Sequence, residues 1–386
     1  MSKLNDVVIN KLSGGLGRRT PEQDMVSGLL FSGASTDELD NDKVVLLASL
    51  EDAEAYGVTE LNDVEGQSAY YQIQQFFRMN PSGDLYIMKT AATSYEVITG
   101  KAKDMQEKAN GNIRQMAIIY SGATTFAQTQ AAVLKAKTET QLAYADYMPF
   151  EVILEGKGFS IEEATSLAEL TAENVSVVVA MDVEKAEKYP NSAAVGLALG
   201  AISKAKVSEN IAWIEKFNLT GEGFAKAGFV GGEEVKALGT LGDLNDKRYI
   251  FARTHTGLPG VYFNDSATCT TGTSDFAYVE NNRTINKATR LLRTALLPKL
   301  ASPVLVDIDG KLPQSVSKSF EGLCRSALEG MIANQEVSAF DVYVDPKQNI
   351  LATSELKVKA EITPVGTARK IMVDLGFKNP FGIDKA

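Results

Sequence analysis

Short apolar runs alternate with helix-like segments between residues 36 and 240, and this alternation limits the fold more than any other feature of the chain. The apolar runs predict strands at 44–48, 85–88, 116–120, 150–154 and 175–180. The segments between them predict helices at 51–56, 69–79, 125–146 and 192–205. Strands that alternate with helices form mostly parallel sheets covered by helices. The predicted fold class is therefore α/β for this region and α+β for the chain as a whole.

The first 35 residues are predicted to form an arm outside that sheet. A short β-prone run carries Val7, Val8, Ile9 and Leu12. Residues 13–19 follow, and Gly14, Gly15 and Gly17 make this stretch too glycine-rich for a helix interior. A terminal strand without a nearby partner must pair with a distant segment or with another chain. Residues 1–35 are thus assigned as an N-terminal arm and residues 36–275 as the α/β domain.

The alternation is lost at 241–275, where strands are predicted at 248–252 and after a turn at 257–263. The last third has its own pattern, with helices predicted at 283–297 and 315–334. Between them, an apolar strand at 304–308 ends in Asp309 and Gly310, a hairpin signal. Period-two alternation predicts further strands at 340–344, 356–362 and 371–377. The last follows Pro364 and Gly366 and could leave as a second arm, which gives a C-terminal domain at 276–366 and a C-terminal arm at 367–386.

The charge balance restricts the partners of the chain. The 39 basic and 49 acidic side chains give a net charge of −10, which argues against binding to nucleic acid or to an anionic membrane. The apolar run at 192–202 is too short to span a bilayer. The first residues lack the apolar core of a secretory signal peptide, and two cysteines cannot form a disulfide framework. Synthesis in a reducing cytoplasm is therefore expected.

Residue chemistry offers few catalytic or ligand-binding groups. The chain has one histidine, His255, whereas a histidine-ligated metal site usually needs two or three. Nothing near His255 in the sequence supplies both the orienting carboxylate and the nucleophile that a catalytic base needs. A catalytic Cys269 or Cys324 would need an activating base, and His255 is the only imidazole in the chain. Residues 13–19 lack the Lys-Ser/Thr ending of a phosphate-binding loop, and Asp307 to Gly310 supplies only half of a calcium loop. We predict no catalytic residue, metal or cofactor, and keep an α/β enzyme that binds a nucleotide or sugar phosphate at the strand ends as the alternative.

The helix predicted from residue 283 carries an unusual charge. Arg283, Lys287 and Arg290 follow helical spacing along one face. The stretch 283–300 contains five basic residues and no acid, a net charge of +5 in a chain of −10. Such a stripe is read either as a solvated face or as a contact surface for an acidic partner.

The order of segments in the last third resembles the core of contractile tail sheath proteins. The segments that carry the resemblance are the basic helix at 286–293, the helix at 320–332, and the stretches 340–346, 356–365 and 368–371. Residues 50–57, 76–77 and 81–87 are similar to the start of the first sheath domain. Proteins of this kind occur in contractile-tailed phages, R-type bacteriocins and related injection systems, and the resemblance fits all three.

The resemblance implies a structural subunit and not an enzyme. Such subunits stack as six-fold rings around an inner tube, are linked by strand exchange between neighbours, and contract to drive the tube through a target envelope. The expected partners are further copies of the chain, an inner tube protein, and baseplate and terminator proteins. Assembly is expected in the bacterial cytoplasm, as part of a virion tail or injection particle. A tube or baseplate component is disfavoured because tube proteins are much shorter.

The resemblance also assigns roles to residues. The intersubunit strand arms would carry Val7, Val8, Ile9 and Leu12 at one end, and Ile371, Val373, Leu375 and Phe377 at the other. Hinges are expected at Gly14, Gly15, Gly17 and Gly366, because glycine tolerates large backbone changes. Arg283, Lys287 and Arg290 are predicted to face the tube, and Lys318 and Arg325 on the next helix are the competing assignment.

Overall fold

The computed structural model describes residues 23–33, 36, 38–64 and 66–378. The chain divides into two compact units, Met1–Ser302 and Pro303–Ala386. The predicted boundary at 275–276 differs from this division, because the basic helix packs within the first unit. Each unit is described by itself below.

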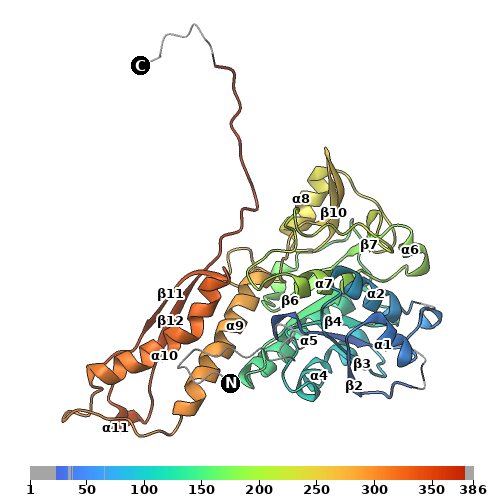
Figure 1. The fold of residues 1–386 in the computed structure, drawn as a ribbon. Coiled ribbons are helices and arrows are strands. Elements are labelled where there is room, and N and C mark those ends of the chain that lie inside the picture. Colours follow the sequence, from blue (N-terminus) through green and yellow to red (C-terminus); the bar gives the residue numbers. More distant parts are fainter. Residues whose placement is uncertain (1–22, 34–35, 37, 65, 379–386) are drawn as a thin grey trace, which may run out of the picture. The chain divides into compact units, whose positions relative to one another are not determined.

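The first unit is built on a six-stranded sheet, of which Figure 1 labels β2, β3, β4 and β6. The strand order in this sheet is β2-β3-β1-β4-β5-β6. Neighbouring strands run parallel, except that β2 is antiparallel to β3. The predicted mostly parallel sheet is therefore confirmed. The strands of this sheet are β1 Ser27–Phe31, β2 Val44–Leu47, β3 Leu85–Lys89, β4 Gln115–Ile119, β5 Glu151–Glu155 and β6 Val175–Val178.

Helices cover both faces of this sheet. Successive residues of β1 point to opposite faces, with Leu29 and Phe31 in the core that contains α2 and α7, and Leu30 in the core that contains α3, α4 and α5. The helices of the unit are α1 Leu50–Ala55, α2 Ala69–Met79, α3 Tyr95–Thr99, α4 Ala102–Lys108, α5 Phe126–Ala145, α6 Lys185–Lys188, α7 Val195–Lys204, α8 Leu238–Asp246 and α9 Val279–Leu296. Short 3-10 turns lie at η1 Gln23–Met25, η2 Glu60–Asn62, η3 Ala168–Leu170 and η4 Leu297–Lys299. Two small antiparallel pairs complete the unit, β7 Ala180–Asp182 with β8 Ala227–Phe229, and β9 Ala252–His255 with β10 Leu258–Phe263.

Local sequence signals explain where the longer helices begin and how they pack. Thr125 and Gln128 form a capping box at the start of α5. In α7, Gly196 lies so close to α2 that an added Cβ would come within 2.0 Å of the Gln72 carbonyl oxygen. The sequence therefore uses glycine where the two helix backbones nearly touch.

Two expectations for this unit differ from the structure, the extent of the N-terminal arm and the position of one strand. Residues 27–31, assigned to the arm, form the central strand β1, because they pair with β3 and β4 and are fully buried on both faces. The strand predicted at 248–252 is reduced to a single bridge between Ile250 and Val178, and the regular strand β9 begins at Ala252. Arg248 has a positive φ of 75°, which no regular strand accommodates.

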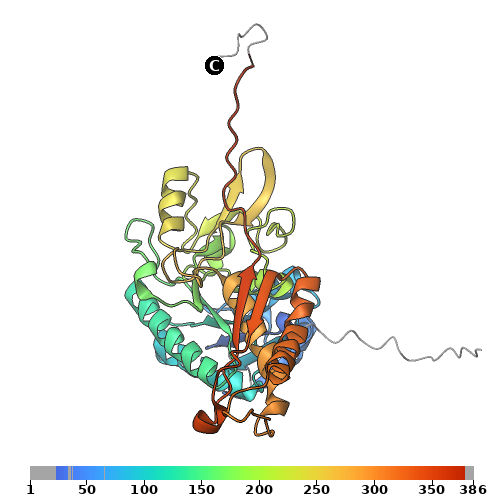
Figure 2. The same cartoon turned by 90° about the vertical axis from the view of Figure 1, so that its left-hand side faces the viewer.

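The second unit consists of α10 Gln314–Ala333, β11 Val337–Tyr343, α11 Ile350–Thr353 and β12 Lys359–Pro364. Figure 2 shows β11 and β12 side by side, with α10 alongside them. The strand predicted at 304–308 is absent from the described chain: these residues pair with no strand, Leu305 is 77% exposed, and the Asp307 N–H closes a turn to the Lys311 carbonyl. The strand predicted at 371–377 is likewise not formed within the described subunit.

Candidate intersubunit site

A small core joins α10 to the β11–β12 sheet. The buried residues of α10 recur at intervals of four and three and so form one face of the helix: Ser317, Glu321, Cys324, Leu328 and Met331. This face packs on β11. Because α10 covers β11 rather than β12, the apolar residues of β12 are only partly covered.

The strand register places the remaining apolar residues on that same side of the sheet. Phe340 pairs with Ile362, and Val342 pairs with Ala360. Val342 is buried, whereas Phe340, Ala360 and Ile362 are half-buried. The opposite side is polar, with Lys359 Nζ 2.8 Å from Glu361 Oε1. The sheet thus has one polar side and one incompletely covered apolar side.

Among the described residues, this sheet consists of two strands. Within the described residues, each strand therefore has one edge that no further strand occupies. An isolated two-stranded sheet is marginally stable, and its edges are templates for pairing with another chain. These edges are the candidate site for strand addition between subunits.

The segment after β12 has the pattern of a strand but no strand partner in the described subunit. Residues 365–378 form neither helix nor strand and extend from the end of β12 (Figures 1 and 2). Ile371, Val373, Leu375 and Phe377 alternate along it and are 81%, 77%, 93% and 108% exposed. Because this much apolar surface is costly in water, these four residues are suited to burial against another surface. A Cβ added at Gly366 would meet no atom within 4 Å, so packing does not explain this glycine and its hinge role stays a prediction.

The other predicted arm and hinge positions lie outside the described residues. They are Val7, Val8, Ile9 and Leu12 in the arm, and Gly14, Gly15 and Gly17 in the hinge. Their assignments stay predictions.

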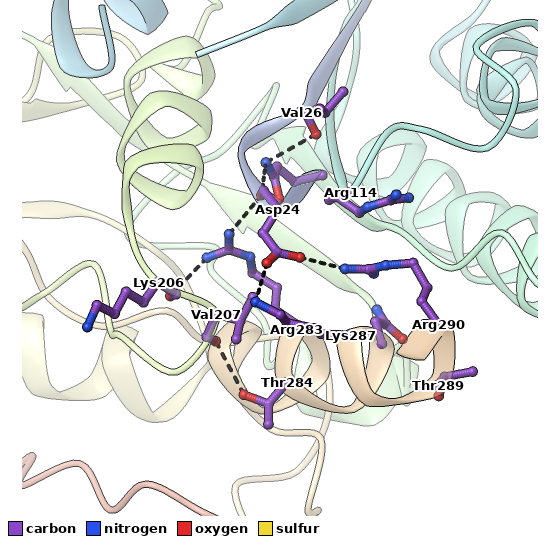
Figure 3. A network of polar contacts seen from close by, with 12 residues as sticks. Asp24, Val26, Arg114, Lys206, Val207, Arg283, Thr284, Lys287, Thr289 and Arg290 are labelled. Carbon is purple, nitrogen blue, oxygen red and sulfur yellow. Dashed lines mark hydrogen bonds and ion pairs between the residues drawn. The ribbon is translucent and has the colours of Figure 1, made fainter. Parts of the chain in front are cut away.

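The predicted basic stripe on α9 lies against Asp24, just before the central strand (Figure 3). Lys287 Nζ lies 2.5 Å from one carboxylate oxygen of Asp24, and Arg290 Nη2 lies 2.6 Å from the other. Burial favours the neutral acid, but these two cations, with Arg283, outweigh it and lower the pKa of Asp24. One carboxylate therefore binds two members of the stripe inside the subunit.

Arg283 is the most buried member of the stripe, with 4% of its surface exposed. Its guanidinium donates to the backbone oxygens of Asp24, Ala205 and Lys206 at 3.1–3.2 Å. Burial lowers its pKa to about 10. These contacts connect α9 to the end of α7 and to the segment before β1, so Arg283 acts within its own subunit. The assignment of Arg283, Lys287 and Arg290 to a tube-facing surface stays a prediction. The contacts described here give all three cations a structural role inside their own subunit.

The competing cations lie on α10 and are more accessible. The side chains of Lys318 and Arg325 are 63% and 45% exposed. Both contact carboxylates of their own unit, Glu321 and Asp341 respectively. Lys318 and Arg325 thus resemble the α9 stripe in binding carboxylates of their own unit, but their side chains are more exposed to solvent.

A buried carboxylate that sequence reasoning missed lies beside the stripe. Glu151, at the start of β5, accepts hydrogen bonds from Asn174 and Asn286 at 2.8 and 2.9 Å. Burial raises the pKa of Glu151 to about 8, although both amides and Arg283 oppose the shift. The pKa of Glu151 therefore lies above the ordinary range of a glutamate, whereas that of Asp24, which binds two members of the stripe, lies below the ordinary range of an aspartate.

A buried ion pair lies at the carboxyl end of β5, the end of the sheet at which an α/β enzyme would bind its ligand. Lys157 Nζ lies 3.7 Å from Glu155 Oε2, and both side chains are at most 1% exposed. Lys157 also donates to the Asn191 carbonyl, and the Ala193 N–H donates to Glu155. Burial raises the pKa of Glu155 against the opposing effect of Lys157. Both groups are therefore engaged by contacts within the subunit.

The other sequence candidates form no catalytic arrangement in the described residues. His255 lies on β9, with the centre of its ring 5.9 Å from that of Tyr262. Burial lowers the pKa of His255, and the positive charge of Arg253 lowers it further. Cys269 is fully buried, which raises the pKa of its thiol to about 12. Asp307 uses a carboxylate oxygen to accept from the backbone of Asp309 and Lys311, as a turn residue does.

The described residues form neither a metal-binding cluster nor a membrane-spanning helix. No group of three or more histidine, cysteine, aspartate or glutamate side chains in that part of the chain could hold a metal ion. None of the helices in the described ranges is long and apolar enough to cross a membrane.

Two family models match the chain. The DUF2586 N-terminal domain matches residues 4–267, and the DUF2586 C-terminal domain matches residues 275–382. No curated protein matches in sequence.

Solved structures similar to the chain come from contractile particles. The helical sheath of the anti-feeding prophage in its contracted state matches with a TM-score of 0.67 at 13% identity, over 98% of this chain and 100% of that one. A chain of the six-fold symmetrised baseplate of the same particle matches with a TM-score of 0.65 at 13% identity, with the same coverage. The contracted PVC sheath complex, from an extracellular contractile injection system, matches with a TM-score of 0.64 at 13% identity, over 98% of both chains. The predicted sheath fold is thereby confirmed.

Proposed function

This chain belongs to the DUF2586 family, and from that premise and its fold we propose that it is the structural subunit of a contractile sheath. Copies of the chain polymerise as stacked six-fold rings around an inner tube, and the ends of this sleeve meet baseplate and terminator proteins. The particle assembles in the bacterial cytoplasm. The subunit acts through its contacts with other chains and carries out no chemical reaction.

One observation carries the proposal. The fold similarity to the contracted anti-feeding prophage sheath extends over 98% of this chain and the whole of that one. It therefore includes the β11–β12 sheet and most of the segment that follows, as well as the α/β unit. A sheet with open edges and an exposed strand-like segment in the same subunit support strand exchange between copies.

The same features support a mechanism for contraction. A segment that leaves one copy and pairs with a sheet of the next forms a contact that propagates from copy to copy and does not close on itself. Chain connections of this kind keep neighbours linked while the compact units move as nearly rigid bodies. The extended sleeve is metastable, and the additional surface buried between subunits on contraction releases the free energy that drives the tube.

Electron microscopy of the full chain, expressed with and without its tube protein, tests this function. We expect hollow cylinders with helical striations. A uniform monomer at high concentration in both preparations would contradict the proposal.

Point variants in the exposed segment test the strand arm without truncation. Val373→Asp combined with Leu375→Asp places charges on the apolar side of the arm, so cylinders should be lost while the subunit stays folded. Met372→Asp is the matched control, because residue 372 lies on the alternate side and is also 77% exposed. Loss of cylinders in both variants, or in neither, would refute the role of the alternating residues. Deletion of residues 1–12 extends the same test to the other end of the chain.

A further inference from the structure

Helix α5 ends on a tyrosine whose backbone conformation favours glycine. Tyr147 has a positive φ of 63°. The Tyr147 N–H donates to the Tyr144 carbonyl at 2.9 Å, and the Met148 N–H donates to the Ala143 carbonyl at 2.8 Å. These two bonds form a Schellman motif, in which the left-handed position is usually a glycine. A bulky residue there is strained, so the end of the helix does not explain the choice of tyrosine.

Burial does not explain this tyrosine either. Tyr147 is 56% exposed, and the guanidinium of Arg293 on α9 lies over its ring, with the central carbon 3.5 Å from the ring centre. Stacking of this kind fixes the orientation of the guanidinium. Backbone strain that is kept at an exposed side chain is typical of a binding site. The structure thus holds Arg293 in place through a residue that helix geometry disfavours.

Arg293 also differs from the three cations of the α9 stripe, which are engaged within the subunit. Among the described residues, the Arg293 guanidinium makes no hydrogen bond or ion pair, so its N–H groups are available to a partner. Leu297, four residues later and so on the same side of the helix, is 46% exposed. Exposed tyrosine and arginine side chains are the residues on which protein interfaces most often depend. We call Tyr147, Arg293 and Leu297 the Tyr147–Arg293 platform.

An acidic surface of the same chain is complementary to this platform. Residues 38–64 contain eight acidic side chains and one basic side chain, a net charge of −7. Within this range the turn η2 carries Leu61, which is 88% exposed, beside Glu60, whose side chain is 67% exposed. The Thr59 N–H donates to Asn62 Oδ1 at 2.8 Å, which holds the turn in shape. The turn therefore presents an apolar side chain and a carboxylate next to each other.

The turn and the platform lie on different sides of the first unit. Glu60 Oε1 is 3.1 Å from Lys188 Nζ of α6. Figure 1 shows α6 and α9 at opposite sides of this unit. A contact between the turn and the platform therefore joins two copies. Because the two surfaces differ, such a contact continues from copy to copy.

We propose that the Tyr147–Arg293 platform binds the η2 turn of a second copy of this chain. The Arg293 guanidinium binds the Glu60 carboxylate, and Leu61 packs against Tyr147 and Leu297. The inference rests on the proposed sheath function and adds a contact between copies that is separate from the strand arms. The opposite charges favour encounter in this register. Because the ring of Tyr147 already orients the guanidinium, little side-chain freedom is lost on binding.

Reversal of the two charges tests this contact in the full-length chain. Arg293→Glu should raise the critical concentration for cylinder assembly roughly tenfold or more, measured by sedimentation. Adding Glu60→Arg should restore assembly, because the ion pair forms again with its charges exchanged. Lys299→Glu is the matched control, since it makes the same change of charge in the same basic stretch and should assemble like the wild type. Equal effects of Arg293→Glu and Lys299→Glu, or no recovery in the exchanged pair, would overturn the proposal.

Variants of Tyr147 separate binding from folding. Tyr147→Gly removes the ring and relieves the backbone, so the unfolding midpoint of the unassembled subunit should not fall. Assembly should nevertheless weaken as it does for Arg293→Glu. Tyr147→Phe keeps the ring and should assemble like the wild type. Normal assembly of Tyr147→Gly would overturn the platform as a binding surface.

A photoreactive benzoylphenylalanine at position 147 identifies the occupant in particles assembled on the tube. We expect a cross-linked dimer whose linked peptide comes from residues 38–64 of another copy. A peptide from the tube protein, a link within one copy, or no link would overturn the second copy as occupant. Cylinders that form but do not respond to Arg293→Glu would overturn this inference alone. A wild type that forms no cylinders would overturn the proposed function as well.

Discussion

The substitution Asp24→Asn separates a structural role of the basic stripe from a contact role. Asparagine keeps the size of the side chain and the backbone carbonyl that binds Arg283, and it removes only the negative charge. The substitution leaves Arg283, Lys287 and Arg290 on one face of α9 without the carboxylate that two of them bind.

The expected cost follows from the burial of the ion pairs. Removing one partner of a buried pair destabilises a protein by roughly 3–5 kcal/mol. The side chains of Asp24, Lys287 and Arg290 retain between 13% and 18% exposure, so some solvent screening remains. We therefore expect the lower end, a loss of about 3 kcal/mol in the free energy of unfolding.

Urea unfolding of the full chain, followed by the fluorescence of Trp213, measures this loss, because Trp213 is the one tryptophan and belongs to the same unit as Asp24. Asp40→Asn is the matched control, since Asp40 lies 3.9 Å from Lys43 in an exposed pair that should contribute little. Adding Lys287→Gln to Asp24→Asn should restore part of the stability, as a double-mutant cycle would show. A loss for Asp24→Asn no larger than that for Asp40→Asn would refute the structural role. The stripe would then be available to bind a partner.

Three further outcomes are expected. Because the folded pKa of Glu151, about 8, lies above the ordinary 4.5, this group makes the subunit less stable as pH rises from about 4.5 to about 8. Between pH 5 and pH 8 the wild type should lose about 3 kcal/mol that Glu151→Gln retains, and a constant difference between the two proteins would contradict the buried acid. Gly196→Ala should lower the free energy of unfolding by about 3 kcal/mol, since the added Cβ would meet the backbone of α2. Gly239→Ala in α8 is the control and should be neutral, because an added Cβ there meets no atom within 4 Å. Equal unfolding midpoints for the two variants would refute the close approach of α7 to α2. Arg325→Met should remove the hydrogen bond that the Arg325 guanidinium donates to the Val342 carbonyl on β11, and irregular aggregation measured by light scattering should increase because the strand edge is then open. Unchanged scattering would show that this side chain does not protect the edge of β11.

The predicted strands that were confirmed are those with local apolar runs between helices. The predicted range 85–88 lies within β3, and the ranges 116–120 and 150–154 overlap β4 and β5 with a shift of one residue, because buried parallel strands are continuous apolar stretches. The central strand β1 was missed because it is only five residues long. It is also buried by pairing with residues more than 50 positions later, which no local pattern indicates. The run at 304–308 shows the opposite case, in which a strand-like pattern has no partner in the described chain.

The contacts of the candidate site could be predicted only in part. The alternation at 371–377 and at β11 and β12 was readable, because strand periodicity is a local property. The position of Arg283 inside the first unit was not readable, because its partner Asp24 lies more than 250 residues away. The hydrogen bonds of Arg325 to the Val342 carbonyl and of the Val344 N–H to Glu321 were missed for a similar reason: a charged residue on a helix has the same sequence pattern whether it faces solvent or binds a backbone group.

The central place of β1 has a mechanical consequence. The turn η1 Gln23–Met25 leads directly into β1, which lies between β3 and β4, so a pull applied to the chain at Gln23 would be shared by two neighbouring strands. A pull along β1 loads its ladders with β3 and β4 in shear, which strains many hydrogen bonds at once, whereas a strand at the margin of the sheet would have one such ladder to resist the same pull. A subunit with this connection can transmit a pulling force through its folded core without unfolding.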